Sequence, residues 1–439
     1  MFSLLRCCLF PFLFLALISL FFTVGLSAST AIIAAYYAND SHSRPPIGNR
    51  PPFTVDRIDP SLLTDLYVAF AAIGYVSASI EPDHPRLTGD FTLQPTMKED
   101  KDHLYPQLVD LKKRSKKPLR LFLSIGGWNF NNPEHSEGKT TYRLFSQMVS
   151  TAENRKQFIT SAIDFAHRYG FDGIDIDWEY PGDPARGGSE RDFNNFPVFL
   201  KECSAAFSQA NPPLLLSFTA PAFIPFRLQA HFQADPSRFY KWLADCAQFV
   251  DRINIMAYDY HGPFDVPRIT GVNAPLNQDT DRASPLYIAK TLQNYLDNGV
   301  PAQKMVLGLP LFGHIYAGVS VLQPGNTGPG KPFETGGAPG PATREKGMLA
   351  YYEIADKMAQ KQLSFGSDPV TSTVYGYNFH SQEWASFDNP DTIKLKAMLA
   401  LTFKLKGVFF WSIDLDEYQW EPKFPNIRSA RQVFSESRE

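Results

Sequence analysis

The chain contains 439 residues, with 42 Lys and Arg against 45 Asp and Glu, so its formal net charge is −3. This length accommodates one large domain or two to three ordinary ones. Hydrophobic residues make up 44% and charged residues 20%, which excludes a disordered or highly charged chain. The near-neutral balance argues against a nucleic-acid-binding protein. Aromatic residues reach 14%, a content that suits thick cores and also sites where sugar rings stack on aromatic side chains.

The first 28 residues are typical of an export signal. One positive charge, Arg6, precedes an uncharged apolar run over residues 7–26, and small residues follow it. A run of about 20 apolar residues could instead anchor the chain in a bilayer. Cleavage is favoured because small residues close the run and a strand-like segment begins at Ala31. We therefore predict a signal peptide over residues 1–28 and a secreted, extracellular mature chain.

Removal of that segment would leave two cysteines, Cys203 and Cys246. In a secreted chain they either form one disulfide or are two buried thiols, and both possibilities stay open. Their spacing does not suggest a metal site. One glycosylation sequon, Asn39-Asp40-Ser41, is relevant only if the host glycosylates its secreted proteins.

Eight short apolar runs recur along the chain, and each is followed by a longer mixed stretch. Continuous apolar runs of this length fit strands of a parallel sheet buried on both faces. The stretches between them have helical periodicity, for instance 154–169 and 239–249. Eight such units predict an α/β fold, a (β/α)8 TIM barrel. The runs are 31–37, 66–73, 119–126, 171–179, 214–220, 251–258, 304–310 and 407–414.

An inserted module is predicted between the seventh and eighth strands. The seventh run starts at 304 and the eighth at 407, a spacing about twice the others. The intervening chain holds a Gly/Pro-rich stretch, a helix-like segment and strand-like runs. We predict a small α+β domain over residues 313–387 that forms one wall of a cleft, and a barrel built from 29–312 and 388–439.

The fourth run carries three carboxylates at every second position, Asp175, Asp177 and Glu179. Alternate residues of a strand share a face, so these three point one way and the apolar residues between them point the other. In a barrel strand the acidic set lines the interior. Three ionised carboxylates there are costly, so the cluster requires shared protons, strong partners or a metal ion.

Three interpretations of this cluster compete. A solvated acidic edge is disfavoured by the interleaved apolar residues. A Mg²⁺ or Ca²⁺ site stays open, because Asp clusters bind these ions. General acid catalysis fits Glu179, which lies at the C-terminal end of the strand, where barrel enzymes bind substrate. A carboxylate beside other carboxylates has the raised pKa that an acid catalyst needs near neutral pH.

The pattern Asp172-x-x-Asp175-x-Asp177-x-Glu179 resembles the signature of family 18 glycoside hydrolases, the chitinases. Segments at four further strands match the family in order and position, and the module before strand eight resembles its chitinase insertion domain. The resemblance extends from about Ile32 to Phe434. The four matches are Ala69-Phe70-Ala71 on strand two, Ser124-Ile125-Gly126-Gly127-Trp128 on strand three, Met256-Ala257-Tyr258-Asp259 on strand six and Trp411 on strand eight.

The resemblance implies a retaining glycosidase that cleaves β-1,4 bonds of chitin and chitooligosaccharides by substrate-assisted catalysis. Glu179 would protonate the glycosidic oxygen while the acetamide carbonyl of the sugar attacks the anomeric carbon, giving an oxazolinium ion. Asp177 would orient the acetamide and share a proton with Asp175, and Glu179 would then activate water. No metal or organic cofactor is implied. The expected partners are N-acetylglucosamine oligosaccharides, not nucleic acid or membranes, and the chain is expected to act as a monomer.

The resemblance also implies a set of residues at the reacting sugar. Tyr258 resembles the tyrosine that donates a hydrogen bond to the acetamide carbonyl. Asp259 resembles the neighbouring acid that contacts the distorted sugar, and Met256 belongs to the same substrate-binding motif. Trp411 resembles the aromatic floor on which that sugar stacks.

Other residues are expected near the same subsites. Tyr36 and Trp128 resemble cleft residues, although core packing is the general alternative for a buried ring. For Phe70 the two interpretations are evenly balanced. Asp172 has the opposite strand parity to the three carboxylates and is expected to cap the start of the strand.

The sequence departs from the family pattern at three positions. Asp40 and Phe264 lie where many relatives carry Trp, and His314 lies where Arg is frequent. These positions concern the outer subsites, and therefore chain-length preference. Two other functions share the fold: a chitinase-like lectin that binds without cleaving, and an endo-β-N-acetylglucosaminidase acting on N-glycans. The lectin is disfavoured because the four catalytic side chains are present, and the endoglycosidase because such enzymes commonly lack the insertion.

Overall fold

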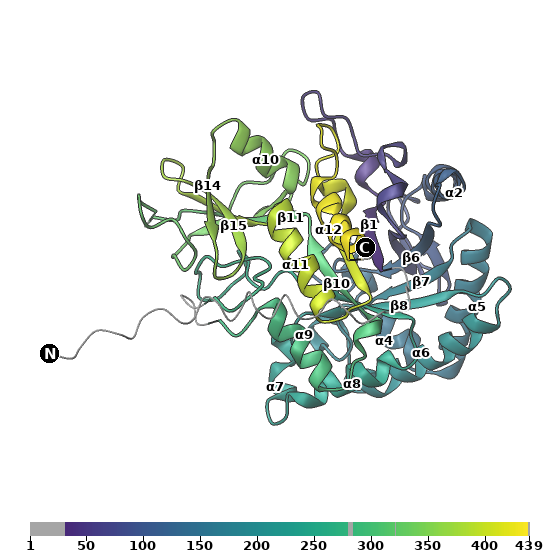
Figure 1. Cartoon of the computed structure of the whole chain (residues 1–439). Coiled ribbons are helices and arrows are strands. Elements are labelled where there is room, and N and C mark those ends of the chain that lie inside the picture. Colours follow the sequence, from purple (N-terminus) through teal and green to yellow (C-terminus); the bar gives the residue numbers. More distant parts are fainter. Residues whose placement is uncertain (1–30, 280–283, 321, 438–439) are drawn as a thin grey trace. The chain divides into compact units, whose positions relative to one another are not determined.

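The computed structural model describes residues 31–279, 284–320 and 322–437, and the predicted signal segment lies outside these ranges. From Ile32 onward the chain forms one compact unit, shown as a cartoon in Figure 1. Within the described ranges, no helix is long and apolar enough to cross a membrane.

A closed barrel of eight parallel strands forms the core. The ring runs β1-β17-β10-β9-β8-β7-β6-β2, and pairing of β1 with β2 closes it. Each strand overlaps one of the eight predicted runs, which confirms the (β/α)8 TIM barrel. The strands are β1 (Ile32–Ala38), β2 (Asp65–Ile73), β6 (Arg120–Gly126), β7 (Gly173–Asp177), β8 (Leu215–Pro221), β9 (Arg252–Met256), β10 (Met305–Pro310) and β17 (Gly407–Trp411).

Helices cover the outside of the barrel, as Figure 1 shows for α5, α6 and α8. The Thr151 side chain caps the N-terminus of α5 by accepting a hydrogen bond from Asn154 N, and Gly170, with φ 78°, ends that helix in the left-handed conformation. The helices are α2 (Tyr105–Arg114), α3 (Gly138–Thr141), α4 (Leu144–Val149), α5 (Ala152–Tyr169), α6 (Asp192–Gln209), α7 (Gln229–Phe232), α8 (Ser237–Ala247), α9 (Ile288–Asp297), α11 (Pro390–Thr402) and α12 (Pro425–Glu436).

The outward face of β7 is apolar, as its alternation predicts. Trp178 stacks on Phe145 of α4 at 5.2 Å between ring centroids and meets Phe196 of α6 edge-on at 5.6 Å. The strand ends at Asp177, so Glu179 lies on the loop two residues beyond it rather than within the strand as predicted.

An α+β module is inserted between β10 and β17. Its sheet has the order β12-β11-β16-β15-β14, with β13 paired to β11. One apolar cluster packs the sheet against helix α10, and a second, around the fully buried Trp384, fills its other side. The elements are β11 (Phe312–Ala317), β12 (Thr335–Gly336), β13 (Met348–Ala350), α10 (Tyr351–Ala359), β14 (Ser364–Asp368), β15 (Thr373–Asn378) and β16 (Glu383–Phe387).

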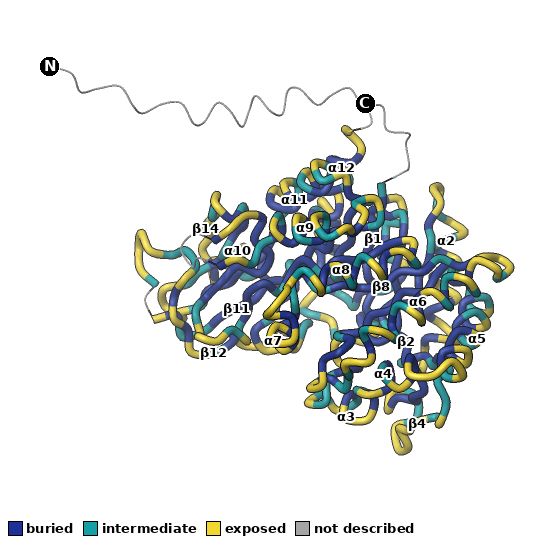
Figure 2. The backbone as a smooth tube through the Cα atoms, turned by 90° about the horizontal axis from the view of Figure 1, so that it is seen from below, coloured by how far each residue is buried: buried dark blue, intermediate teal, exposed yellow. Residues whose placement is uncertain are grey.

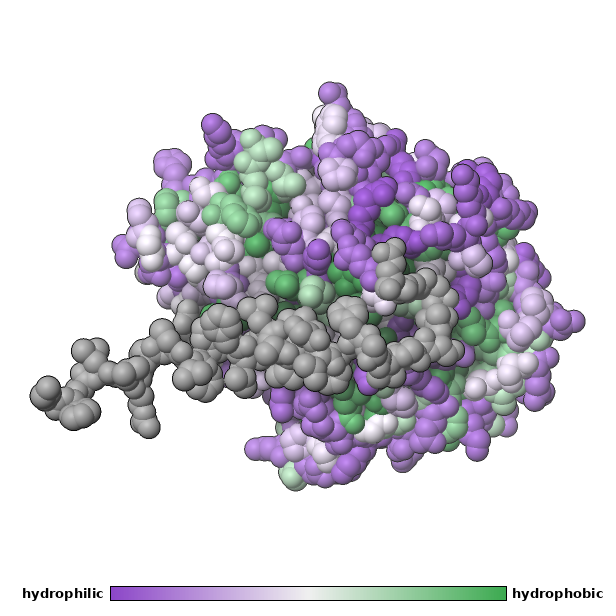
Figure 3. Space-filling model, viewed as in Figure 1, coloured by the Kyte–Doolittle hydropathy of each residue, from purple (hydrophilic) through white to green (hydrophobic). Residues whose placement is uncertain are grey.

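One short strand extends the barrel sheet beyond β2, and two others form a small sheet of their own. β5 (Leu93–Pro95) pairs antiparallel with β2, and β3 (Tyr75–Val76) forms a separate two-stranded sheet with β4 (Arg86–Leu87). Figure 2 shows buried residues along the barrel strands and exposed ones along the outer helices and loops. On the face drawn in Figure 3, hydrophilic residues dominate and hydrophobic residues gather only in small patches.

Two open questions from the sequence have structural answers. Cys203 and Cys246 are buried free thiols in α6 and α8. The sequon residue Asn39 is buried, and its amide nitrogen donates to Thr96 Oγ1 at 2.9 Å and to Asp100 Oδ2 at 3.0 Å. A glycan on that nitrogen would displace both bonds, so the folded chain does not present the sequon.

We predict that the stack behind β7 contributes strongly to stability. Phe145→Ala should lower the free energy of unfolding by about 3–5 kcal/mol, because it leaves a cavity against Trp178. The matched control Phe365→Ala removes a ring that is 50% exposed and should change stability by about 0.5 kcal/mol or less. Denaturant unfolding measures both. Equal effects would show that the stack is not a principal part of the core.

Candidate active site

The three carboxylates rise along β7 towards its C-terminal end. Asp175 lies within the strand, Asp177 ends it, and Glu179 follows on the loop. Their exposed fractions are 0%, 3% and 7%. Removing a carboxylate from water disfavours its charged form, so burial alone raises the pKa of each.

Four other barrel strands, β1, β6, β8 and β9, provide hydrogen bonds to Asp175. Ser217 Oγ on β8 donates to Oδ1 at 2.6 Å, while Ser124 Oγ on β6 and Tyr36 OH on β1 donate to Oδ2 at 2.7 and 2.8 Å. Asn254 Nδ2 on β9 adds a bond of 3.3 Å. Burial raises the pKa of Asp175, and the bonds from Ser217, Ser124 and Tyr36 lower it. These donors stabilise the ionised carboxylate.

Asp177 has fewer compensating contacts. Thr219 Oγ1 donates to its Oδ1 at 2.5 Å. Burial raises its pKa well above the usual value, and the charges of Glu179 and Asp175 raise it further. Asp177 therefore gives up its proton less readily than an exposed aspartate does, and the charges of Glu179 and Asp175 add to that effect.

Glu179 is held on its loop by Arg186, whose guanidinium is buried. Arg186 Nε donates to the backbone oxygen of Glu179, and Nη2 donates to the Trp128 backbone oxygen at 2.5 Å. Burial raises the pKa of Glu179 to about 7, against the lowering effect of the Arg186 charge. Glu179 is thus protonated up to neutral pH, as a general acid must be.

Tyr258 and Asp259 follow β9 on the same side of the barrel. Tyr258 is buried, and its ring lies edge-on to Phe312 and Phe409. Asp259 has φ 58°, a left-handed conformation, and its backbone N–H donates to Asn273 Oδ1 at 2.9 Å. The half-buried Met256 ends β9 just before them.

The predicted aromatic residues form a layer beside Tyr36. Trp411 stacks on Phe70 at 5.6 Å with an interplanar angle of 23°, and its ring centroid lies 5.4 Å from that of the fully buried Tyr36. Gly127, with φ 87°, allows this packing, because a Cβ there would lie 2.6 Å from the Phe70 ring. Trp128 is 51% exposed, and the Arg186 guanidinium lies 3.6 Å from its ring centroid.

The three departures from the family pattern lie at different places. His314, on β11 of the insertion, has its Nε2 2.7 Å from Asp259 Oδ1, so the inserted module contacts the catalytic side of the barrel directly. Phe264 is 55% exposed and meets His314 edge-on at 5.6 Å. Asp40 is exposed and pairs with Arg44.

Asp172 lies away from the other three carboxylates. Its Oδ2 accepts a hydrogen bond from Leu121 N at 2.8 Å, and both oxygens bind Lys112 Nζ at 2.5 and 2.6 Å. It therefore joins α2 and β6 to the start of β7, which fits the structural role expected from its parity.

Sequence reasoning missed the polar residues around the carboxylates. Their signal is a polar residue at alternate positions of an otherwise apolar strand, as at Ser217 and Thr219 on β8 and at Asn254 on β9. Ser124 lies within the strand-three motif, which does not by itself indicate a contact with Asp175. Arg186 ends a three-residue 3-10 helix, Pro184–Arg186, which is too short to leave a periodic pattern in the sequence.

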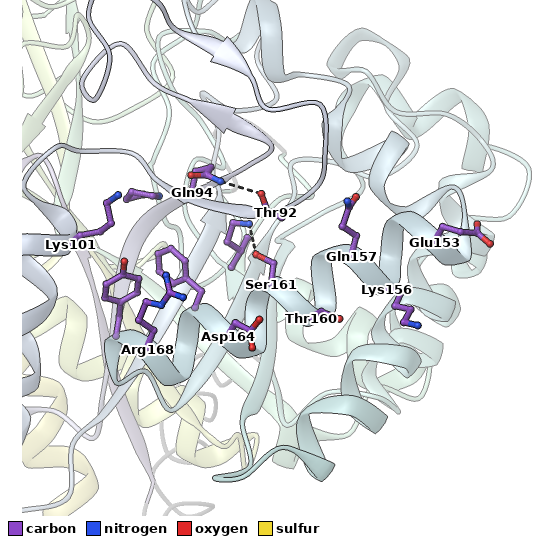
Figure 4. Close-up of a pocket in the computed structure, with 14 residues that line it drawn as sticks. Thr92, Gln94, Lys101, Glu153, Lys156, Gln157, Thr160, Ser161, Asp164 and Arg168 are labelled. Atoms are coloured by element: carbon purple, nitrogen blue, oxygen red, sulfur yellow. Dashed lines mark hydrogen bonds between the residues drawn. The ribbon is translucent and has the colours of Figure 1, made fainter.

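No group of three or more His, Cys, Asp or Glu side chains among the described residues is arranged to hold a metal ion. A groove of about 660 Å³ lies between α5 and β5 (Figure 4), and its lining includes Gln94, Lys101 and Arg168. Ser161 Oγ accepts a hydrogen bond from Leu93 N across it. None of the candidate site residues lines this groove.

Comparison with known proteins agrees with this geometry. Residues 32–416 match the glycosyl hydrolases family 18. The chain is 30% identical over 387 residues to chitotriosidase-1 of Mus musculus, covering 85% of this chain and 72% of that protein. The Group IV chitinase of Ostrinia furnacalis superposes with a TM-score of 0.75 at 28% identity, over 92% of this chain and 100% of that one.

Human YKL-39, described as a pseudo-chitinase that retains chitooligosaccharide binding, is equally similar in structure. Its TM-score is 0.74 at 26% identity, over 92% of this chain and 100% of that one. Both the matched segment and the similarity to chitotriosidase-1 cover most of the described chain. The chain therefore belongs to the glycosyl hydrolases of family 18.

Proposed function

We propose that this chain is a chitinase, a retaining glycosidase that hydrolyses the β-1,4 bonds of chitin and chitooligosaccharides. The observation that carries the proposal is Glu179, a buried carboxyl group with a pKa of about 7 at the C-terminal end of a barrel strand. A carboxylic acid that keeps its proton at neutral pH can donate it to a leaving group.

The reaction begins with Glu179 donating its proton to the glycosidic oxygen as the bond to the anomeric carbon breaks. In substrate-assisted hydrolysis the nucleophile is the acetamide carbonyl oxygen of the sugar itself, so a cyclic oxazolinium ion forms. Glu179, now ionised, accepts a proton from the water that attacks the same carbon. Two displacements at one carbon retain its configuration, and the proton returns to Glu179.

Asp177 and Tyr258 hold the acetamide in this scheme. Asp177 accepts a hydrogen bond from the acetamide N–H and faces the positive charge of the oxazolinium ion, while Tyr258 OH donates to the acetamide oxygen. Thr219 fixes one oxygen of Asp177. Asp175 shares the pair's proton and charge with Asp177, so the two titrate together.

The aromatic layer provides the sugar floor. Trp411, stacked on Phe70, contributes a rigid ring face for the distorted sugar, and Asp259 contacts the same sugar. Trp128, exposed and bound by Arg186, Met256 and Tyr36 complete the predicted substrate contacts. No cofactor is required.

A non-catalytic lectin is the second candidate, because a structural relative is described as a pseudo-chitinase. A protein that only binds has no use for a buried acid that keeps its proton at neutral pH, and here Glu179, Asp177, Asp175 and Tyr258 are all present. An endo-β-N-acetylglucosaminidase is a weaker candidate, since the insertion is uncommon in such enzymes.

We further propose how the chain is processed and divided into domains. Residues 1–28 are removed as a signal peptide, and the mature chain acts outside the cell as a monomer. The catalytic barrel comprises 29–312 and 388–439, and residues 313–387 form the insertion domain.

We predict that Glu179→Gln lowers turnover of a fluorogenic N,N′-diacetylchitobioside by about 10²–10⁴-fold, because the amide has no acidic proton. Affinity for chitooligosaccharides should persist, as calorimetry will show. Glu153→Gln, at an exposed position of α5, is the matched control and should leave turnover unchanged. Wild-type turnover in Glu179→Gln would disprove the mechanism.

We also predict that kcat/KM of the wild type falls as pH rises through about 7, because Glu179 then loses its proton.

Asp177→Asn should lower kcat by about 10²–10³-fold, since the oxazolinium ion loses its anionic partner. The substitution should also alter the acid limb of the pH–rate profile. Asp110→Asn, whose side chain is 67% exposed, is the control. An unchanged pH–rate profile in Asp177→Asn would contradict the coupled pair.

A further inference from the structure

An arginine lies inside the barrel, on the strand next to the one that bears Ser217. Arg252 begins β9, and its side chain is 1% exposed. Its Nη1 lies 3.1 Å from Asp65 Oδ1 and donates to Tyr67 OH at 3.3 Å. Its guanidinium also lies 4.5 Å from the centroid of the Phe122 ring. Burying a guanidinium removes its hydration at a large cost in free energy, which only charged or hydrogen-bonding partners can offset.

The negative charge beside Arg252 is already shared. Asp65, fully buried, also binds Arg120 through two bonds, Nε to Oδ1 at 2.7 Å and Nη2 to Oδ2 at 3.0 Å. Two guanidinium groups therefore face one carboxylate, which leaves one positive charge in excess. Lys406 lies near the same group, and burial together with the charge of Arg252 lowers its pKa. The charge of Asp251 acts in the opposite direction on Lys406. Even so, Arg252, Arg120 and Lys406 outnumber the carboxylates Asp65 and Asp251 at this end of the barrel, which is therefore electropositive.

This excess charge lies close to the acidic strand. Ser217 of β8 pairs with Arg252 on one side and with Asp175 on the other, so Arg252 is two strands from Asp175 at matching register. A second route runs through two rings: Tyr67, bound to Arg252, stacks on Tyr36 at 4.7 Å between centroids, and Tyr36 OH donates to Asp175.

We propose that Arg252 is a positioning residue for the catalytic carboxylates, holding negative charge on the Asp175–Asp177 pair and fixing the Tyr67–Tyr36 stack that bonds to it. The proposal rests on the function proposed above. It assigns a role in the reaction to a residue below the site that touches neither substrate nor reacting atoms.

The expected consequence is electrostatic. Burial raises the pKa of Asp175, while its hydrogen bonds and the charge of Arg252 lower it. The other two carboxyl groups follow it, Asp177 at the end of the same strand and Glu179 on the loop beyond. The oxazolinium ion needs an anionic pair, so activity is lost when the pair takes up its last proton at low pH. Without Arg252 this protonation occurs at higher pH.

The test compares pH profiles of kcat/KM for chitopentaose between pH 3 and 8. Arg252→Met should move the acid limb upwards by about 0.5–1 pH unit, whereas Arg252→Lys, which keeps the charge, should restore most of the wild-type limb. Asp65→Asn removes the shared negative charge and should move the limb downwards. Arg252→Met and Asp65→Asn are expected to move the acid limb in opposite directions, so either variant tests the proposal if the other fails to fold.

Arg155→Met is the matched control. Arg155 is also a buried guanidinium bound to one carboxylate, Glu202 at 2.8 Å, but it lies on α5, outside the barrel. It should lower stability without moving the acid limb. An acid limb that stays at the wild-type pH in folded Arg252→Met, or moves equally in Arg155→Met, would overturn the proposal.

A failure of the proposed function can be distinguished from a failure of the role proposed for Arg252. If the wild type binds chitopentaose without cleaving it, the chitinase proposal fails, and the pH midpoint of binding measured by calorimetry replaces the acid limb as the readout. That midpoint should move upwards in Arg252→Met, because the acetamide N–H binds the anionic pair. A midpoint that does not move, or a wild type that neither binds nor cleaves, would overturn the role of Arg252.

Discussion

Three carboxyl groups are buried in succession along β7 and the loop that follows it, and the strands, loops and charges around them compensate for their burial. Each loses its hydration, and each ionised neighbour opposes ionisation of the next. The surroundings of the carboxyl groups change from one to the next along β7 and its following loop, and this change resolves the conflict. Four donors around Asp175 offset part of the effect of its burial, whereas Asp177 has few compensating contacts and its pKa is raised well above the usual value. Burial raises the pKa of Glu179 to about 7. β7 and the loop after it thereby place three carboxyl groups in three different electrostatic environments.

The fold provides what this arrangement requires. A closed parallel barrel brings β1, β6, β8 and β9 around β7, and each contributes a hydroxyl or amide at the level of Asp175. The loop after β7 contributes Arg186, which fixes the backbone of the acid, and the inserted module contributes His314 beside Asp259. The excess positive charge around Arg252 lies below. Stability and chemistry therefore depend on the same interior, because a change in any of these strands changes the carboxylates.

Much of this could be predicted from the sequence. Eight apolar runs were sufficient to predict the barrel, because strands buried on both faces leave a continuous apolar pattern. The double-length spacing between the seventh and eighth runs was sufficient to predict the insertion. Alternation along 174–178 was sufficient for the inward carboxylates and for the outward ring of Trp178. The end of β7 at Asp177 was not predictable from alternation, since the loop continues the pattern by one period. Arg186 and the pairing of Arg252 with Asp65 were not predictable either, because contacts between distant segments leave no local pattern.

We propose that this chain cleaves chitin by way of an intermediate formed on the substrate. The most direct measurement is proton NMR of chitopentaose hydrolysis in its first minutes, before the new reducing ends equilibrate between anomers. The β-anomer should appear first, because two displacements retain configuration, and Glu179→Gln should yield no product. Initial formation of the α-anomer would contradict the mechanism, and absence of any product from the wild type would contradict the assignment of this site as a chitinase.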